Sequence, residues 1–119
     1  MQLVATRHST LAPPPHVVHE SLLQPDRDPT RPWLVLHVDE LRPVVLRAEA
    51  PYLLVWSFLW PDRPQDAVRL DLAAVHGGGT RLRWTWLSAA APPGPARVRE
   101  VRARLGQLLF GRLRETYDQ

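Results

Sequence analysis

The sequence predicts an α+β fold in which one curved antiparallel sheet of about six strands wraps a long C-terminal helix. Short β-like segments follow one another through the middle of the chain, and turn residues separate them. One apolar stripe at helical spacing then runs through the last quarter of the chain. The 119 residues fit a single domain, 1–119.

The first elements are a strand and a short helix. Leu3–Leu11 alternates loosely and is rich in valine, threonine and leucine, which predicts a strand. Three prolines follow, and proline is well suited to the first turn of a helix. His16–Gln24 has its apolar residues at helical spacing and predicts a short amphipathic helix. Pro25–Pro32 holds three prolines in eight residues, so we expect a loop.

Five further β-like segments come next, with prolines or glycines between most of them. Short strands joined by short turns favour an antiparallel meander over parallel βαβ units. The segments are Trp33–Asp39, Val44–Glu49, Leu53–Trp60, Ala67–Val75 and Thr80–Leu87.

Alternation predicts both the faces and the register of the last two strands. A three-residue loop at 77–79 pairs His76 with Thr80 and brings the apolar residues of both strands onto one face. In this register Leu72 lies opposite Trp84 and Leu70 lies opposite Trp86. A two-residue loop would place apolar residues opposite charged ones.

Leu53–Trp60 is apolar on both faces. We expect Leu54, Trp56, Phe58 and Trp60 to face inward, because the other set contains the only polar residue, Ser57. The outward set would then be too apolar for a face exposed to water, and a homodimer contact is one way to cover it.

The C-terminal segment predicts a helix over Ala96–Tyr117, with Pro95 at its first position. Arg102 and Arg112 flank the apolar stripe of this helix. We expect Glu100 and Arg104, four residues apart, to pair weakly on the opposite side. The stripe consists of Val98, Val101, Leu105, Leu108, Leu109 and Leu113.

Composition excludes several classes of function. The chain has no cysteine, which excludes disulfides and thiol chemistry. No apolar run reaches the ~20 residues of a membrane span, and we expect a cytoplasmic location. The net charge of +3 lies in residues 97–119, but the arginines there point around the helix, so we do not expect nucleic-acid binding.

No motif indicates a metal or a cofactor. His16 and His19 stand three residues apart, which matches none of the zinc-protease patterns, and we expect both to face solvent. The glycines of Gly77–Gly79 precede a strand rather than a helix and lack the spacing of a phosphate loop, so they predict a hairpin turn.

Three segments in this order resemble the START-like superfamily, also called SRPBCC or helix-grip, which includes polyketide cyclase/dehydrase-like proteins. They are Ala12–Val18 (APPPHVV), Arg42–Leu46 (RPVVL) and Gly77–Leu82 (GGGTRL). The resemblance implies a sheet gripping the long helix, with a cavity between them for apolar molecules. The chain differs in being short and in having a loop at Pro25–Pro32, where members have a second small helix.

These observations predict a domain that binds a small, largely apolar or aromatic molecule, with no metal or cofactor. Tryptophan rings either line such a pocket or fill it, and a flanking arginine could meet a carboxylate on the ligand. The predicted ligand-binding residues are Trp56, Phe58, Leu70, Leu72, Trp84, Trp86, Arg102, Leu105, Leu109 and Arg112, with Leu113 beside them.

Two alternatives stay open. The first is a cyclase, dehydratase or hydrolase acting on a polyketide-like or aromatic substrate. His37 and Asp39, on one face of their predicted strand, would be its acid–base pair. The second is a structural or dimerising domain with a filled core. Neither the residues of the chain nor its resemblance to the superfamily identifies the ligand.

Overall fold

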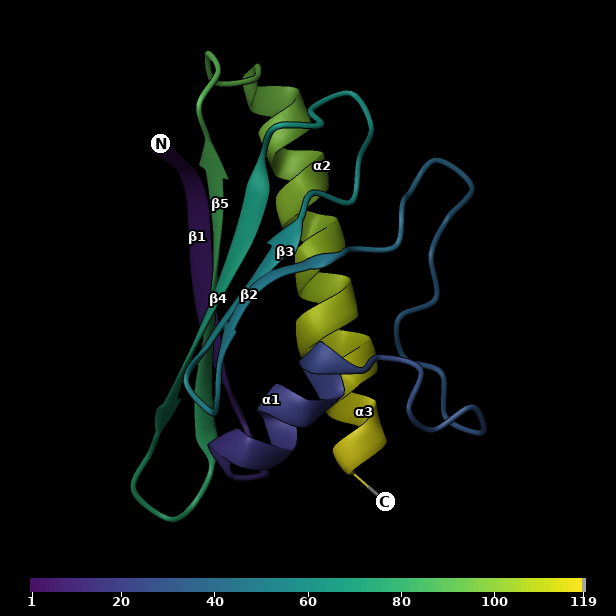
Figure 1. Cartoon of the computed structure of the whole chain (residues 1–119), viewed down its shortest axis with the longest axis vertical. Helices are drawn as coiled ribbons and strands as arrows, with labels where there is room; N and C mark the ends of the chain where they lie inside the picture. Colours follow the sequence, from purple (N-terminus) through teal and green to yellow (C-terminus); the bar gives the residue numbers. More distant parts are fainter. Residues whose placement is uncertain (119) are drawn as a thin grey trace.

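The computed structural model describes residues 1–118, which form one antiparallel sheet, a short helix and a C-terminal helical segment (Figure 1). The first helix begins at Pro15, a position where proline removes no helical hydrogen bond. The elements are β1 (Gln2–Leu11), α1 (Pro15–Leu23), β2 (Val45–Glu49), β3 (Leu53–Ser57), β4 (Ala67–Ala74), β5 (Thr80–Ser88), α2 (Pro95–Gly106), η1 (Gln107–Arg112) and α3 (Leu113–Tyr117).

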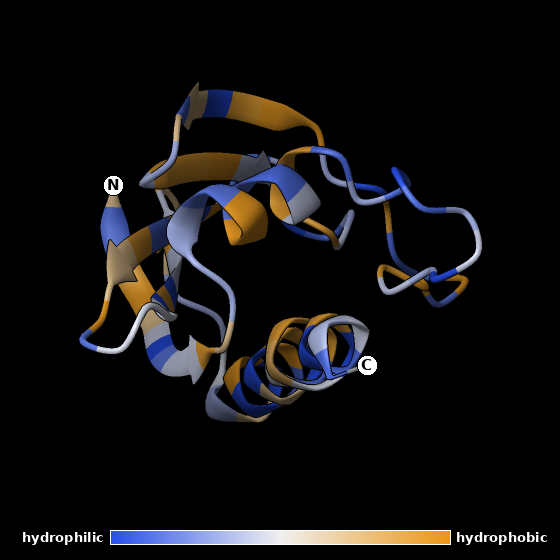
Figure 2. Ribbon diagram, turned by 90° about the horizontal axis from the view of Figure 1, so that it is seen from below, coloured by the Kyte–Doolittle hydropathy of each residue, from blue (hydrophilic) through white to orange (hydrophobic). Residues whose placement is uncertain are grey.

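The sheet curves around the C-terminal helical segment. Its strand order is β1-β5-β4-β3-β2, and every neighbouring pair is antiparallel. The helical segment lies along one face of the sheet, and α1 crosses one end of the space between them (Figures 1 and 2). One continuous core therefore lies between the sheet and the helices.

The sheet has five strands, and the predicted strand over Trp33–Asp39 is wrong. Trp33 and Leu34 are buried in the core, but the backbone beyond them turns instead of pairing with a strand. The Glu40 N–H donates to the His37 carbonyl over 3.0 Å, and the His37 N–H donates to the Glu40 carboxylate over 2.7 Å. Residues 33–41, named the strap below, thus run from the core to the helix. The loop expected at Pro25–Pro32 is present.

The predicted register of β4 and β5 is wrong by two residues, although both inner faces are correct. The turn is at 76–78: the Val75 N–H donates to Gly79, and Leu72 pairs with Leu82 rather than Trp84. Gly77 and Gly78 have φ of 97° and 98° and supply the turn. Gly79 passes so close to β1 that a Cβ would lie 2.7 Å from the Leu11 oxygen. Pairing with β1 therefore sets where β5 begins.

The prediction of a single long α-helix is also wrong, because the helical segment consists of three parts. The segment is helical from Pro95 to Tyr117, but α2 has 12 residues, the π-helical η1 has six and α3 has five. The π-helical stretch starts after Gly106 and contains Gly111, and glycine is a poor helix former. It keeps Leu105, Leu109 and Leu113 fully buried along one side of a long segment.

The inner set of Leu53–Trp60 is buried as predicted, but half of the outer set is buried as well. Leu53 is 8% exposed and Leu59 is 0% exposed. Leu53 lies near α1, whose His19 ring contacts its carbonyl oxygen, and Leu59 comes after β3 has ended. Exposed apolar side chains gather instead on the strap and around β2; they are Val35, Val38, Leu41, Val44, Leu46 and Tyr52. Within residues 1–118, no helix is long and apolar enough to cross a membrane.

Candidate functional site

The structure brings the predicted apolar ligand-binding residues together in one cluster between sheet and helix. Each is at most 4% exposed, so they form the centre of the core. They are Trp56, Phe58, Leu70, Leu72, Trp84, Trp86, Leu105 and Leu109, together with Leu113. Arg102 and Arg112 lie on the exposed side of the helical segment. Ten residues separate them, roughly 15 Å along a helix, so one carboxylate does not reach both.

Three fully buried indoles differ in how their N–H groups are satisfied. The Trp86 Nε1–H donates to the Asp66 carboxylate over 2.8 Å, and the Trp56 Nε1–H donates to the Leu22 carbonyl over 3.2 Å. The Trp84 Nε1–H has no acceptor among residues 1–118. A buried donor usually finds a partner, because an unpaired one costs about 1–3 kcal/mol. Trp84 is therefore the exception within this core.

Asp66 holds one end of the aromatic cluster in place. Its carboxylate, nearly fully buried, also accepts hydrogen bonds from the Ser88 hydroxyl and the Arg63 guanidinium. Burial by itself would raise the pKa of Asp66. The hydrogen bonds from Ser88, Arg63 and Trp86 together have a larger, opposite effect, so the pKa lies below its ordinary value. Asp66 is therefore an ionised anchor for Trp86.

A cavity opens beside the aromatic cluster between the end of α1, the following loop and α3. Its volume is about 260 Å³, and Trp33 lines it. The Trp33 ring stacks on Trp56 at a centroid distance of 6.3 Å and an interplanar angle of 21°. The wall of this cavity therefore includes a ring of the aromatic core. Its other walls include Ser21, Gln24, Arg27, Asp28 and Arg31.

A smaller cavity of about 180 Å³ lies between the strap and α2. Two core residues, Trp60 and Val101, contribute to its wall, so this cavity also borders the core. Polar residues of the strap and helix form the rest; among them are His37, Asp39, Glu40 and Arg104.

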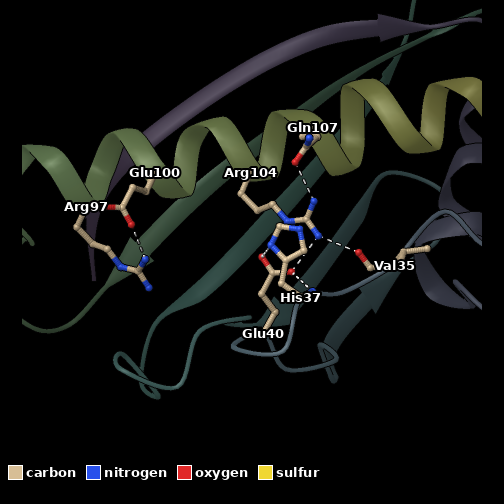
Figure 3. A network of polar contacts seen from close by, with 7 residues as sticks. All are labelled: Val35, His37, Glu40, Arg97, Glu100, Arg104 and Gln107. Atoms are coloured by element: carbon tan, nitrogen blue, oxygen red, sulfur yellow. Dashed lines mark hydrogen bonds and ion pairs between the residues drawn. The ribbon is translucent and has the colours of Figure 1, made fainter.

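The strap is attached to α2 by an ion pair (Figure 3). The Arg104 guanidinium donates to both Glu40 carboxylate oxygens, over 2.8 and 2.9 Å, and to the Val35 carbonyl over 2.8 Å. Burial by itself would raise the pKa of Glu40. The hydrogen bonds from Arg104 and from the His37 N–H, together with the charge of Arg104, have a larger, opposite effect. The pKa of Glu40 therefore lies below its ordinary value.

The proposed acid–base pair does not lie on a strand, as the alternation of Trp33–Asp39 suggested. His37 and Asp39 are exposed strap residues that line the same small cavity. The His37 Nδ1 lies 3.9 Å from a Glu40 oxygen. Sequence reasoning missed Glu40 and paired Arg104 with Glu100, whose partner is Arg97. A contact between residues 64 positions apart leaves no periodic signal in the sequence.

The expectation that both α1 histidines face solvent is wrong for His19. Its side chain is buried, and its Nε2 lies 3.0 Å from the Leu53 carbonyl oxygen, while His16 is exposed. Leu22, one turn further along α1, lies in the core and marks the helix face that His19 shares. Within residues 1–118, no group of three or more histidine or acidic side chains has the arrangement of a metal site.

A curved antiparallel sheet closed over a C-terminal helical segment, with a short helix after the first strand, is the helix-grip fold that the sequence resemblance implied. The solved structures with a similar fold include the following two. CalU16 from Micromonospora echinospora has a TM-score of 0.66 at 19% identity, covering 89% of this chain and 71% of its own. An AHSA1-like protein from Rhizobium etli has a TM-score of 0.59 at 23% identity, covering 93% and 79%.

These likenesses show the fold. No known family profile matches the chain, and no curated protein matches it.

Proposed function

We propose that this chain binds a small, largely apolar or aromatic molecule between the sheet and the C-terminal helical segment. The observation that carries the proposal is the Trp84 indole, a buried donor without an acceptor among residues 1–118. Its unpaired N–H costs about 1–3 kcal/mol, and an acceptor atom on a bound molecule removes that cost. The proposed function is binding, without a chemical step or a cofactor.

The surroundings of Trp84 support this proposal. Aromatic rings offer flat apolar surfaces to a guest, and Phe58 and Trp86, in the same core as Trp84, stack at a centroid distance of 5.0 Å. Leu105 and Leu109, on the helical segment, belong to the same apolar core. The cavities lined by Trp33 and by Trp60 border this core from outside.

Native mass spectrometry of gently purified protein is the first test. Extra mass that survives native conditions and disappears on denaturation would support the proposal and give the mass of the guest. A clean mass with no added ligand, followed by no uptake from a diverse panel of apolar and aromatic compounds, would contradict it and favour a filled core.

A pair of matched compounds tests the role of Trp84. 2-Acetylnaphthalene carries a carbonyl acceptor, and 2-ethylnaphthalene has nearly the same shape without it. We expect Trp84→Phe to weaken binding of the ketone relative to the ethyl compound about fivefold, the effect of losing one hydrogen bond of about 1 kcal/mol. The ratio is informative because altered packing changes both affinities, and an unchanged preference in Trp84→Phe would contradict the assignment.

A further inference from the structure

Two cavities meet in a groove between the end of α1, the 24–33 loop and α3. The first, of about 260 Å³, is the cavity lined by Trp33. The second has a volume of about 240 Å³. Arg31 and Thr116 line both, so the two spaces adjoin. Together they reach the lower part of the range of about 300–1,000 Å³ that small-molecule pockets occupy.

One end of the groove carries two arginines that the protein leaves without partners. Arg31 and Arg112 both line the second cavity. Among residues 1–118, neither makes an ion pair or a side-chain hydrogen bond. Most other arginines are engaged, including Arg27 with Glu20 and Arg114 with Ser9. Two like charges facing one space without an intervening partner repel each other, and an anion between them removes that repulsion.

The acidic residues that line the groove, Asp28 and Glu115, make no ion pair with either arginine within residues 1–118. Asp28 accepts hydrogen bonds from the Thr30 N–H and hydroxyl, over 3.0 and 2.6 Å, within its own turn. Glu115 lines the second cavity but makes no ion pair within residues 1–118. Arg31 and Arg112 against Glu115 give the second cavity one net positive charge. In the first cavity, the pKa of Asp28 lies below its ordinary value because of its hydrogen bonds with Thr30 and, to a smaller extent, because of the charge of Arg31. Because a guanidinium presents a planar fork of N–H donors, a carboxylate is the anion it matches best in shape.

The other end of the groove is aromatic. Trp33 is only 4% exposed, yet it lines the first cavity, so its accessible part belongs to the groove. Its stack on Trp56 continues this aromatic surface into the core. A cationic end next to an aromatic end fits a molecule that has a flat apolar body and a carboxylate.

We propose that the groove binds the carboxylate of a small aromatic acid, with Arg31 and Arg112 donating to its oxygens and Trp33 contacting its ring. This inference goes beyond the proposed function, because none of the residues given above for the site at Trp84 lines the two cavities of the groove. It also selects Arg112 over Arg102, which lines none of the cavities described above.

The test uses 2-naphthoate and its uncharged counterpart 2-naphthamide, each titrated into the full chain by isothermal calorimetry at low salt. We expect the acid to bind about tenfold more tightly than the amide, the effect of hydrogen bonds between charged groups. Arg31→Gln and Arg112→Gln should each remove most of this preference. Arg99→Gln is the control, since it removes the same charge from an exposed site on α2. Amide NMR shifts on adding the acid should centre on Thr30 and Thr116.

The outcomes separate this inference from the proposed function. Equal affinity for acid and amide in the natural protein would overturn the carboxylate site and leave apolar binding standing. An equal loss of acid binding in Arg99→Gln and Arg112→Gln would also overturn it, because the effect would then come from overall charge. Failure of both probes to bind the natural protein, confirmed by unchanged NMR spectra, would overturn the carboxylate site, while native mass spectrometry and the compound panel described above decide the proposed function.

Discussion

Arg104 on α2 and Glu40 on the strap form an ion pair with two hydrogen bonds, from Nε to Oε2 over 2.8 Å and from Nη2 to Oε1 over 2.9 Å. The Glu40 side chain is 1% exposed and the Arg104 side chain is 12% exposed. A buried carboxylate that loses its partner remains in a low-dielectric site, where its charge is costly. This pair therefore controls how firmly the strap is attached to the helix.

Removing Arg104 should destabilise the protein far more than removing an arginine from a surface pair. We expect Arg104→Met to lower the free energy of unfolding by about 3 kcal/mol, because Glu40 is left buried and unpaired. Arg69→Met is the matched control; its pair with Asp71 is 45% and 40% exposed and should contribute less than about 1 kcal/mol. Urea unfolding at pH 7 measures both, and equal losses would show that the strap pair contributes no more than a surface pair.

Stability should fall in acid because Glu40 and Asp66 both have lowered pKa values in the folded state. Their contribution is fully present above the ordinary carboxyl pKa of about 4 and is lost as the pH falls through the lower folded values. Urea unfolding between pH 2.5 and 7 should show this loss. The double variant Glu40→Gln, Asp66→Asn should be less stable at pH 7 and should depend less on pH. An acid response as steep as in the natural protein would assign it to other groups.

The unpaired Trp84 donor predicts unequal effects of the same substitution at two fully buried sites. Trp86→Phe loses the hydrogen bond to Asp66 and leaves that carboxylate with one donor fewer, whereas Trp84→Phe loses no hydrogen bond within the protein. We expect Trp86→Phe to be the less stable variant by about 1–3 kcal/mol. Denaturant unfolding without added ligand measures the difference. Equal stabilities would imply that the Trp84 N–H has a partner in solution.

Two glycines should respond to alanine with opposite signs. A Cβ at Gly79 would lie 2.7 Å from the Leu11 carbonyl oxygen, so Gly79→Ala must push β1 away from the turn and should destabilise the fold by about 1–3 kcal/mol. A Cβ at Gly106 meets nothing within 4 Å in a helical backbone, so Gly106→Ala should stabilise by up to about 1 kcal/mol. Thermal unfolding of both variants checks the signs, and a stabilised Gly79→Ala would contradict the close approach.

Local sequence patterns predicted most of the elements correctly. The alternation of β4 and β5 predicted which side chains are buried, because successive residues of a strand point to opposite faces whatever its neighbours are. Pro15 and Pro95 stand at the starts of α1 and α2, where a missing N–H removes no helical hydrogen bond. The inward set of Leu54, Trp56, Phe58 and Trp60 was also correct.

The predictions that failed depended on residues far apart in the sequence. Alternation over Trp33–Asp39 is compatible with a strand, but the carboxylate of Glu40 pairs with Arg104 and draws this segment to the helix. A shift of two residues keeps every side chain on its face, so hydropathy could not distinguish the two registers of β4 and β5. The groove of Arg31, Arg112 and Trp33 joins positions that no sequence spacing relates.

The sequence by itself therefore determined the class of fold, the limits of most strands and helices, and the set of side chains that forms the core. These properties follow from the local periodicity of apolar residues and from the backbone restrictions of proline and glycine. Only the tertiary structure decided the strand register, the path of the strap, the burial of His19 and the isolation of the Trp84 N–H. Each depends on a polar or steric contact between distant segments, and such contacts arise only when the chain has folded.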